Sequence, residues 1–287
     1  MESSELIINS DNSIYHLNLK PGEIAKDIII VGDQGRVETV SSFFDQIEIK
    51  KQNREFVTHT GTYKGKRITV LSTGIGTDNI DIVLNELDAL VNIDFEKRIA
   101  KEKLSSLNII RLGTSGALQK DIPIESFLVS EYALGFDGLL NYYDFSMNND
   151  ENSINKAFIE QSAYDSKFAL PYTVHASESL LEKICFDMRS GITATASGFY
   201  GPQGRELRLK LAIPDLNEKL TKFSFEKHLI TNFEMETSAL YGLGRLLGHN
   251  TLTICVIIAN RIAQQFSEDY HPAVISLIKT VLDRIIL

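Results

Sequence analysis

An arginine and a turn of small residues lie together at the end of one apolar segment, and they form a candidate anion-binding site. Arg111 follows Ile109 and Ile110, and Gly113-Thr-Ser-Gly116 comes shortly after it. The apolar residues predict a buried strand, and a guanidinium inside a strand must meet an anion or reach a cleft. Hydroxyl groups and glycine N–H groups can approach that anion closely. The alternative is an internal salt bridge followed by an ordinary turn, and the segment alone leaves it open.

Two more glycine-rich turns come directly after predicted strands. Asp27–Val31 runs into Gly32-Asp-Gln-Gly-Arg36, and Arg67–Leu71 runs into Ser72-Thr-Gly-Ile-Gly76. Ligands of open α/β sheets bind at the carboxyl ends of the strands, and helix N-termini after such turns attract anions. The first turn also has a plainer interpretation, in which its aspartate caps a helix and its arginine lies on the surface.

Two later segments add planar and charged side chains. Ser197–Arg205 places aromatic residues, a glutamine and an arginine around a Gly-Pro turn, which suits a flat heteroaromatic ligand. Phe233-Glu-Met-Glu236 places two carboxylates around a methionine, where a helix is expected to begin and run to Gly248. Taken alone, these groups are equally compatible with a polar surface loop and with solvated carboxylates at a helix N-terminus.

The elements that carry these segments predict the fold class. Strands and helices alternate, which favours an α/β/α sandwich of three layers with a central mixed sheet. We expect a single domain over residues 1–287, with polar insertions near 93–106 and 141–166. The second insertion is expected to hold at most one helix, and its length indicates a lid or an interface element. Further expected elements are strands at 54–63, 125–135, 191–195 and 251–259, and helices at 37–44, 78–92 and 273–287.

Composition excludes several functional classes. A formal net charge of −9 argues against a nucleic-acid-binding face and a basic membrane patch, and no apolar run approaches the ~20 residues that span a bilayer. The N-terminal residues lack a signal sequence, and Cys185 and Cys255 are far apart in the chain. We therefore expect a cytoplasmic protein with reduced cysteines. The scattered histidines give no metal-binding motif.

The glycine turns, the Arg111 segment and Phe233–Glu236, in this order, resemble the nucleoside phosphorylase-I family. The similarity runs from about His16 to the last helix, interrupted by the two insertions, and Phe199–Arg205 resembles the pyrimidine-reading segment of uridine-cleaving members. The resemblance implies reversible phosphorolysis of uridine to uracil and ribose 1-phosphate. The alternatives are a nucleosidase, a phosphorylase of another nucleoside, or a catalytically silent protein that binds nucleoside or phosphate.

The resemblance also implies roles for individual residues. Phosphate is bound by Gly32, Arg36, Arg111 and Thr114, with Arg54 supplied by a neighbouring subunit. Ribose is bound by Met235 and Glu236, with Glu234 in the same pocket and His16 supplied by the neighbour. The base is bound by Phe199, Gln203 and Arg205, between walls formed by Ile257 and Ile258. The residues expected to act in catalysis are Arg111, Gln203, Arg205 and Glu236.

Partners and cofactors follow from the same resemblance. No metal or organic cofactor is expected, and inorganic phosphate is the co-substrate. Because His16 and Arg54 are expected to act across an interface, the minimal unit is a homodimer, and a hexamer remains open. Asn79 replaces a serine that helps to bind a monovalent cation in some bacterial members, which leaves such a cation open. Ala259-Asn-Arg261 lacks the aspartate of purine-cleaving members, which favours a pyrimidine.

Overall fold

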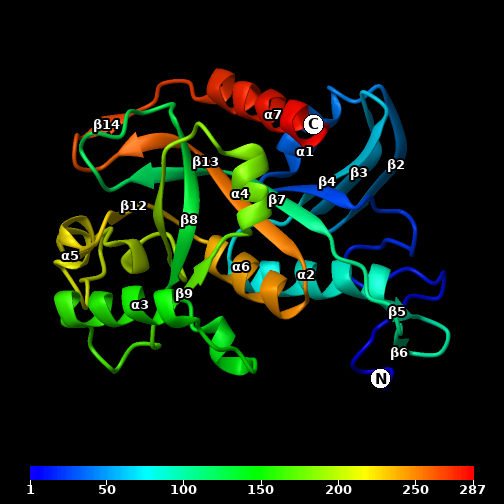
Figure 1. Ribbon diagram of the computed structural model, residues 1–287, viewed down its shortest axis with the longest axis horizontal. Coiled ribbons are helices and arrows are strands. Elements are labelled where there is room, and N and C mark those ends of the chain that lie inside the picture. Colours follow the sequence, from blue (N-terminus) through cyan, green and yellow to red (C-terminus); the bar gives the residue numbers. More distant parts are fainter.

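The computed structural model describes residues 1–287, and a mixed β-sheet forms its centre (Figure 1). The strands of this sheet are β1 (Asp27–Val31), β2 (Gln46–Asn53), β3 (Phe56–Tyr63), β4 (Lys66–Ser72), β7 (Asn108–Ala117), β8 (Phe127–Gly135), β9 (Tyr172–His175), β10 (Ser190–Thr195), β11 (Ser224–Phe225), β12 (His228–Glu234), β13 (Asn250–Asn260) and β14 (Gln265–Phe266). Along the main path the strand order is β11-β12-β10-β8-β13-β7-β1-β4-β3-β2. Strand β12 also pairs with β7, so the sheet curls until strands far apart in this order meet.

Helices pack on the sheet from two sides. They are α1 (Gln34–Ser41), α2 (Thr77–Asn92), α3 (Asn149–Ser162), α4 (Glu178–Ile184), α5 (Leu216–Lys222), α6 (Thr237–Leu246) and α7 (His271–Ile285), with short 3₁₀ helices η1 (Leu139–Tyr142) and η2 (Gly201–Gln203). Helices α1, α4 and α7 lie along one side, and α2 and α6 lie along the other (Figure 1). This arrangement confirms the expected sandwich with a central mixed sheet.

The character of each strand follows from its place in the sheet. All residues of β1 are buried, because β1 lies between β4 and β7 and pairs in parallel with both; central parallel strands are typically such continuous apolar runs. Edge strand β2 instead alternates exposed and half-buried residues and carries lysines, a composition that discourages pairing with another sheet. The parallel pairing of β1, β4 and β7 brings their carboxyl ends to one edge of the sheet.

The two polar insertions take different structures. The first forms a separate hairpin of β5 (Ile93–Asp94) and β6 (Ile99–Ala100). The second contains η1 and α3, and α3 begins with a capping box in which Asn148 and Glu151 satisfy each other's backbone N–H groups. Its one α-helix agrees with the expectation from sequence.

One predicted helix start is wrong. Phe233 and Glu234 belong to strand β12, and α6 begins only at Thr237. Strand pairing with β10 and β7 fixes the extended conformation here. The two carboxylates therefore lie on the connection between a strand and a helix, which brings them to the same edge of the sheet as the ends of β7 and β10.

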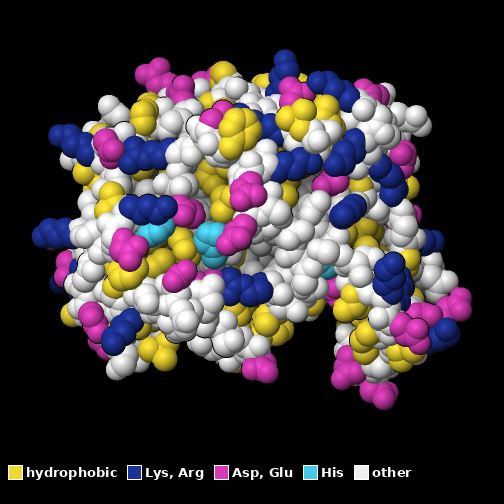
Figure 2. All heavy atoms as spheres, in the orientation of Figure 1, with side chains coloured by type: hydrophobic (Ala, Val, Ile, Leu, Met, Phe, Trp, Pro, Cys, Tyr) yellow, Lys and Arg dark blue, Asp and Glu magenta, His cyan; other side chains and the backbone are white.

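Charged side chains of both signs are interspersed over the face seen in Figure 2. No helix of the chain is both long enough and apolar enough to cross a lipid bilayer.

Candidate active site

One cleft of about 710 Å³ opens at the sheet edge where β1, β4 and β7 end. Its wall includes the turns that follow β1 and β4, the second half of β7 and the connection between β12 and α6. The expected turn at Gly113–Gly116 is wrong, because pairing with β13 and β12 keeps this segment extended as part of β7. All but three of the site residues expected from the sequence line this cleft: Gly32, Arg36, Arg111, Thr114, Phe199, Gln203, Arg205, Glu234, Met235, Glu236 and Ile258. Residues separated by more than two hundred positions in the chain, such as Gly32 and Ile258, are thus brought to one cavity.

Arg111 is the buried cation of the cleft. Its Nη2 pairs with Glu236, and its Nη1 lies 3.3 Å from Glu234 Oε2. Burial alone would lower the pKa of Arg111, but Glu236 and Glu234 together raise it. Its Nε atom is buried and has no partner. The internal salt bridge and the cleft position, which the sequence leaves as alternatives, are therefore both present.

Glycine at position 113 is explained by the Arg111 side chain. The guanidinium lies directly over residue 113, and a Cβ atom there would collide with it and would lie 3.0 Å from Cys255 Sγ. The small-residue segment of β7 thus serves two purposes, because it leaves room for the arginine and lines the cleft.

Arg36 enters the cleft from α1 and makes no ion pair with a carboxylate. Its Nη1 donates to the backbone oxygen of Leu112 at 3.1 Å. Burial, and next the positive charge of Arg111, lower the pKa of Arg36. Two cations that disfavour each other inside one cleft would both be stabilised by an anion between them. The geometry and charge of this end of the cleft therefore suit an anion.

The two carboxylates at the start of α6 are almost fully buried and differ in their partners. Glu236 Oε1 accepts from the backbone N–H of Gly76 at 2.9 Å, and Oε2 accepts from Arg111. Glu234 accepts from the Thr195 hydroxyl at 2.6 Å and from the backbone N–H groups of Glu236 and Thr237. Burial raises the pKa of Glu234, an effect that Arg111 opposes.

Gln203 and Arg205 form a joined pair at the other end of the cleft. Arg205 Nη1 donates to Gln203 Oε1 at 2.7 Å and to the backbone oxygen of Phe199, and its guanidinium lies 3.7 Å from the centre of the Phe199 ring. Burial lowers the pKa of Arg205. The amide oxygen of Gln203 is thus occupied, which leaves its Nε2 group to donate into the cleft.

Arg261 is a supporting residue to which the sequence analysis gave no role. It donates to the backbone oxygen of Gln203, and its Nη2 lies 3.4 Å from Gln203 Oε1. Burial, and next the charge of Arg205, lower the pKa of Arg261 to about 10. Its position directly after β13 was a usable signal, since the end of a strand faces the ligand edge. Phe266 of β14 also lines the cleft and was missed, because a two-residue strand has no periodic pattern.

The expected role of Ile257 in the base pocket is wrong. Ile257 is fully buried and packs with Ala117, Ile122 and Leu128 in a small apolar cluster, whereas Ile258 lines the cleft. Successive side chains of a strand point to opposite faces, and here Ile257 faces the apolar cluster while Ile258 faces the cleft.

His16 and Arg54 lie outside the cleft of their own chain. His16 Nδ1 lies 2.7 Å from Glu86 Oε1. Arg54 lies over the ring of Tyr15 at 5.7 Å and has a left-handed backbone conformation, with φ of 53°. The structure contains one chain, so a contribution of these residues to a neighbouring site stays a prediction.

Glu55 and Asn79 face each other in the cleft wall, at the position where some bacterial relatives are expected to bind a monovalent cation. Asn79 Nδ2 donates to Glu55 Oε1 at 3.3 Å. The Asn79 amide nitrogen therefore occupies one oxygen of the Glu55 carboxylate. The Asn79 side-chain oxygen is a further candidate ligand for such a cation. No three His, Cys, Asp or Glu side chains of the chain come together as a metal site.

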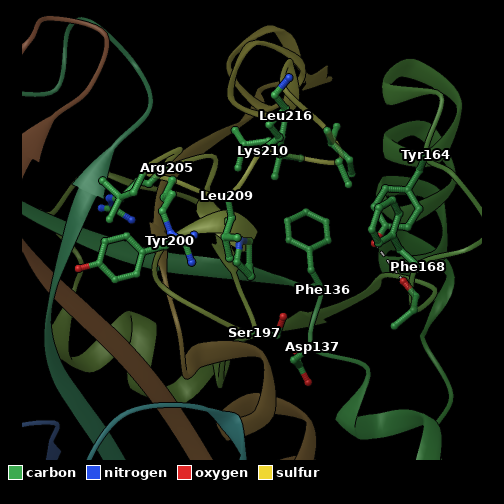
Figure 3. A pocket seen from close by; sticks show the side chains of 18 residues that line it. Phe136, Asp137, Tyr164, Phe168, Ser197, Tyr200, Arg205, Leu209, Lys210 and Leu216 are labelled. Carbon is green, nitrogen blue, oxygen red and sulfur yellow. Dashed lines mark hydrogen bonds between the residues drawn. The ribbon is translucent and has the colours of Figure 1, made fainter.

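A second cavity of about 830 Å³ adjoins the end of the cleft that holds Gln203 and Arg205 (Figure 3). Phe136, Tyr164 and Phe168 form one wall, and the segment after η2 forms the other, with Leu207 and Leu209. Arg205 lines both this cavity and the cleft. The arginine thus separates the two spaces.

The chain is similar to one known protein family and to characterised proteins. The model of the phosphorylase superfamily matches residues 26–286. A uridine phosphorylase of Thermococcus kodakarensis is 30% identical over 260 residues, which cover 88% of this chain and 80% of the relative. A DeoD-type purine nucleoside phosphorylase of Bacillus cereus is 29% identical over 243 residues, which cover 84% and 85%.

Solved structures give the same family. A nucleoside phosphorylase of Trypanosoma brucei that shows uridine phosphorylase activity superposes with a TM-score of 0.87, at 33% identity over 98% of this chain and 99% of that one. A uridine phosphorylase of Phytophthora capsici superposes with a TM-score of 0.71 at 24% identity, over 99% and 98% of the chains, and so supports the fold alone.

Proposed function

The chain belongs to the phosphorylase superfamily, and on that premise we propose that it is a uridine phosphorylase, which converts uridine and phosphate reversibly to uracil and ribose 1-phosphate. The observation that carries the proposal is the cleft itself. It combines two guanidinium groups at one end, a buried carboxylate in the middle and an amide–guanidinium pair at the other end. These are complementary to an anion, a sugar and a planar base, in that order.

The first part of the mechanism is the placement of phosphate. Arg36 and Arg111 bind its oxygens as planar forks, and the Thr114 hydroxyl and the Gly32 N–H group complete the site. Held beside the sugar, phosphate no longer has to be captured from water, which supplies much of the rate by proximity. As the glycosidic bond stretches, the sugar becomes cation-like, and the bound phosphate and Glu236 stabilise it more strongly than they stabilise the ground state.

The second part concerns the leaving base. Uracil gains negative charge on its carbonyl oxygens as the bond breaks. Gln203 Nε2 and the Arg205 guanidinium donate to these oxygens and stabilise the charge in the transition state. Because Arg205 and Arg261 hold the amide oxygen of Gln203, the donor group is oriented before substrate arrives. No nucleophilic side chain is needed.

The preference for a pyrimidine rests on Asn260. Its Nδ2 donates to the backbone oxygens of Gln119 and Ile122, and its Oδ1 accepts from the N–H groups of Ile262 and Ala263. The Asn260 amide is thus fully hydrogen-bonded to backbone groups around the end of β13. An amide is not an acid, so Asn260 cannot protonate a purine ring nitrogen. This distinguishes uridine from the purine substrates named for the DeoD-type relatives.

Phosphate dependence provides the test. Purified protein is expected to release uracil from uridine only when phosphate is present, and to leave inosine intact, because the arginines position phosphate rather than water. Uridine, thymidine and inosine, each assayed with and without phosphate by base release, separate the candidate activities. Equal rates with and without phosphate would indicate a nucleosidase, and no turnover of any of the three nucleosides would indicate a binding protein.

We further propose that the working unit is at least a homodimer, in which His16 and Arg54 of one subunit complete the cleft of the other. Replacement His16→Ala is expected to weaken uridine binding roughly fivefold, the cost of one hydrogen bond, and to spare uracil, which lacks ribose. The measurements are the KM for uridine and the binding of uracil by calorimetry.

A complementation experiment tests the sharing directly. Dimers are re-formed from a mixture of His16→Ala and Arg205→Ala chains, each impaired alone. In mixed dimers one cleft then receives Arg205 from one chain and His16 from the other, so activity is expected to exceed the sum of the separate proteins. Activity equal to that sum, in mixtures shown to exchange subunits, contradicts a shared site.

The remaining assignments extend this proposal. Pyrimidine salvage is the metabolic role of such a reaction, and the cytoplasm is its expected compartment; two buried cysteines that form no disulfide are compatible with a reducing environment.

A further inference from the structure

Thr195, at the end of β10, is a fully buried residue whose hydroxyl hydrogen has a determined direction. The backbone N–H of Ser238 points at its Oγ1 from 3.0 Å. An N–H group can only donate, so Oγ1 is the acceptor of that bond. The hydroxyl hydrogen therefore goes to Glu234 Oε1, 2.6 Å away. Thr195 thus connects the first turn of α6 to the carboxylate that ends β12.

Glu234 has little capacity left for a sugar hydroxyl. Its Oε1 accepts from Thr195, and its Oε2 accepts from the backbone N–H groups of Glu236 at 2.9 Å and Thr237 at 3.0 Å. Oε2 also lies 3.3 Å from Arg111 Nη1. A carboxylate has about four acceptor positions, and donors from the chain itself account for these. Glu236, in contrast, has only Gly76 and Arg111 as recorded partners.

From this geometry we infer that Thr195 is a positioning residue of the phosphate site, which acts through Glu234 to hold the Arg111 guanidinium in place. Glu234 itself then orients Arg111 and the turn before α6, rather than binding ribose as the family resemblance implies. The inference rests on the proposed function only in taking the ligand of Arg111 to be phosphate.

The hydrogen-bonded chain continues behind Thr195 and makes its position rigid. The Ser238 hydroxyl donates to Asp137 at 2.7 Å, and the Tyr172 hydroxyl lies 2.8 Å from Asp137 and 3.0 Å from Ser238. Asp137 lines the second cavity (Figure 3). Groups on β9, on β10 and on the segment after β8 therefore converge on the start of α6. Such a network restricts the positions of its side chains. Arg111 needs a fixed position if its guanidinium is to bind phosphate with two N–H groups.

A substitution of nearly equal volume tests the assignment. Thr195→Val removes the hydroxyl but keeps the side-chain shape, and Thr195→Ser restores the hydroxyl. Thr60→Val is the matched control, because Thr60 is also fully buried in a strand and hydrogen-bonded, to the backbone oxygen of Glu23 and to Thr69, and does not line the cleft. Phosphate binding is measured by calorimetry, the KM values for phosphate and uridine by turnover, and stability by thermal unfolding.

Thr195→Val is expected to bind phosphate roughly tenfold more weakly, as for the loss of one hydrogen bond to a buried charged group. The KM for phosphate should rise with it while the KM for uridine stays close to that of the wild type. Thr195→Ser and Thr60→Val should bind phosphate like the wild type. A purely structural role would lower the melting temperature of both valine variants and leave phosphate affinity unchanged.

Two results overturn the inference: wild-type phosphate affinity in Thr195→Val, or an equal loss in Thr195→Ser. The calorimetric measurement needs no turnover, so it separates this inference from the proposed function. If wild-type protein fails to cleave uridine but shows the expected pattern of phosphate affinities, the proposed substrate is wrong and the role of Thr195 stands.

Discussion

Replacement of Arg111 by methionine is expected to reduce kcat/KM for uridine phosphorolysis by at least ~10²–10³-fold, because it removes a donor that stabilises charge in a buried site. It is also expected to lower the free energy of unfolding by about 3–5 kcal/mol, since Glu234 and Glu236 remain buried without their cation. Methionine keeps the unbranched stem of the side chain and removes only the guanidinium. Activity assays and urea denaturation measure the two effects.

Arg36→Met is the matched control for Arg111→Met. Arg36 faces the same cleft but makes only a hydrogen bond to a backbone oxygen. The Arg36→Met variant should lose phosphate affinity and turnover to an extent similar to Arg111→Met, but its free energy of unfolding should change little. Phosphate should then raise the melting temperature of the wild type but of neither variant. If both variants keep phosphate-dependent stabilisation, the two arginines do not form the phosphate site.

The second large effect is expected at the base end of the cleft. Arg205→Ala should reduce kcat for uridine by ~10²–10³-fold and leave phosphate affinity unchanged. The guanidinium is expected to stabilise charge on the leaving uracil, and it also holds the amide oxygen of Gln203. Turnover is measured with saturating phosphate, and phosphate binding by calorimetry in the absence of nucleoside.

Arg208→Ala is a suitable control for this prediction. Arg208 is on the same segment and lines the second cavity, but it does not line the cleft. Its replacement removes an equal charge and should leave turnover of uridine unchanged. If Arg205→Ala loses phosphate affinity as strongly as it loses turnover, then Arg205 does not read the base.

Much of the fold could be predicted because its elements carry strong local patterns. The apolar run of β1, the α2 helix and the strands on either side of the β3–β4 turn were expected within one or two residues of their observed bounds. Strands β2, β9, β11 and β14 and helices α4 and α5 were missed. Their sequences are polar or brief, and pairing with neighbouring strands decides their conformation. The same tertiary effect extends β12 through Glu234, where helix was expected.

Local order along the chain is enough to predict which side chains reach the ligand edge, because two glycine turns, Arg36 and the Gln203–Arg205 pair follow strands or open helices and Arg111 lies within a strand. Their partners depend on packing between distant segments. Arg111 meets Glu236 across 125 positions, and Thr195 meets Glu234 across two paired strands. The physical reason is that the free energy of a buried charge depends on the donors and acceptors that packing brings within hydrogen-bond distance. Those contacts join segments whose separation in sequence carries no information about their distance in space.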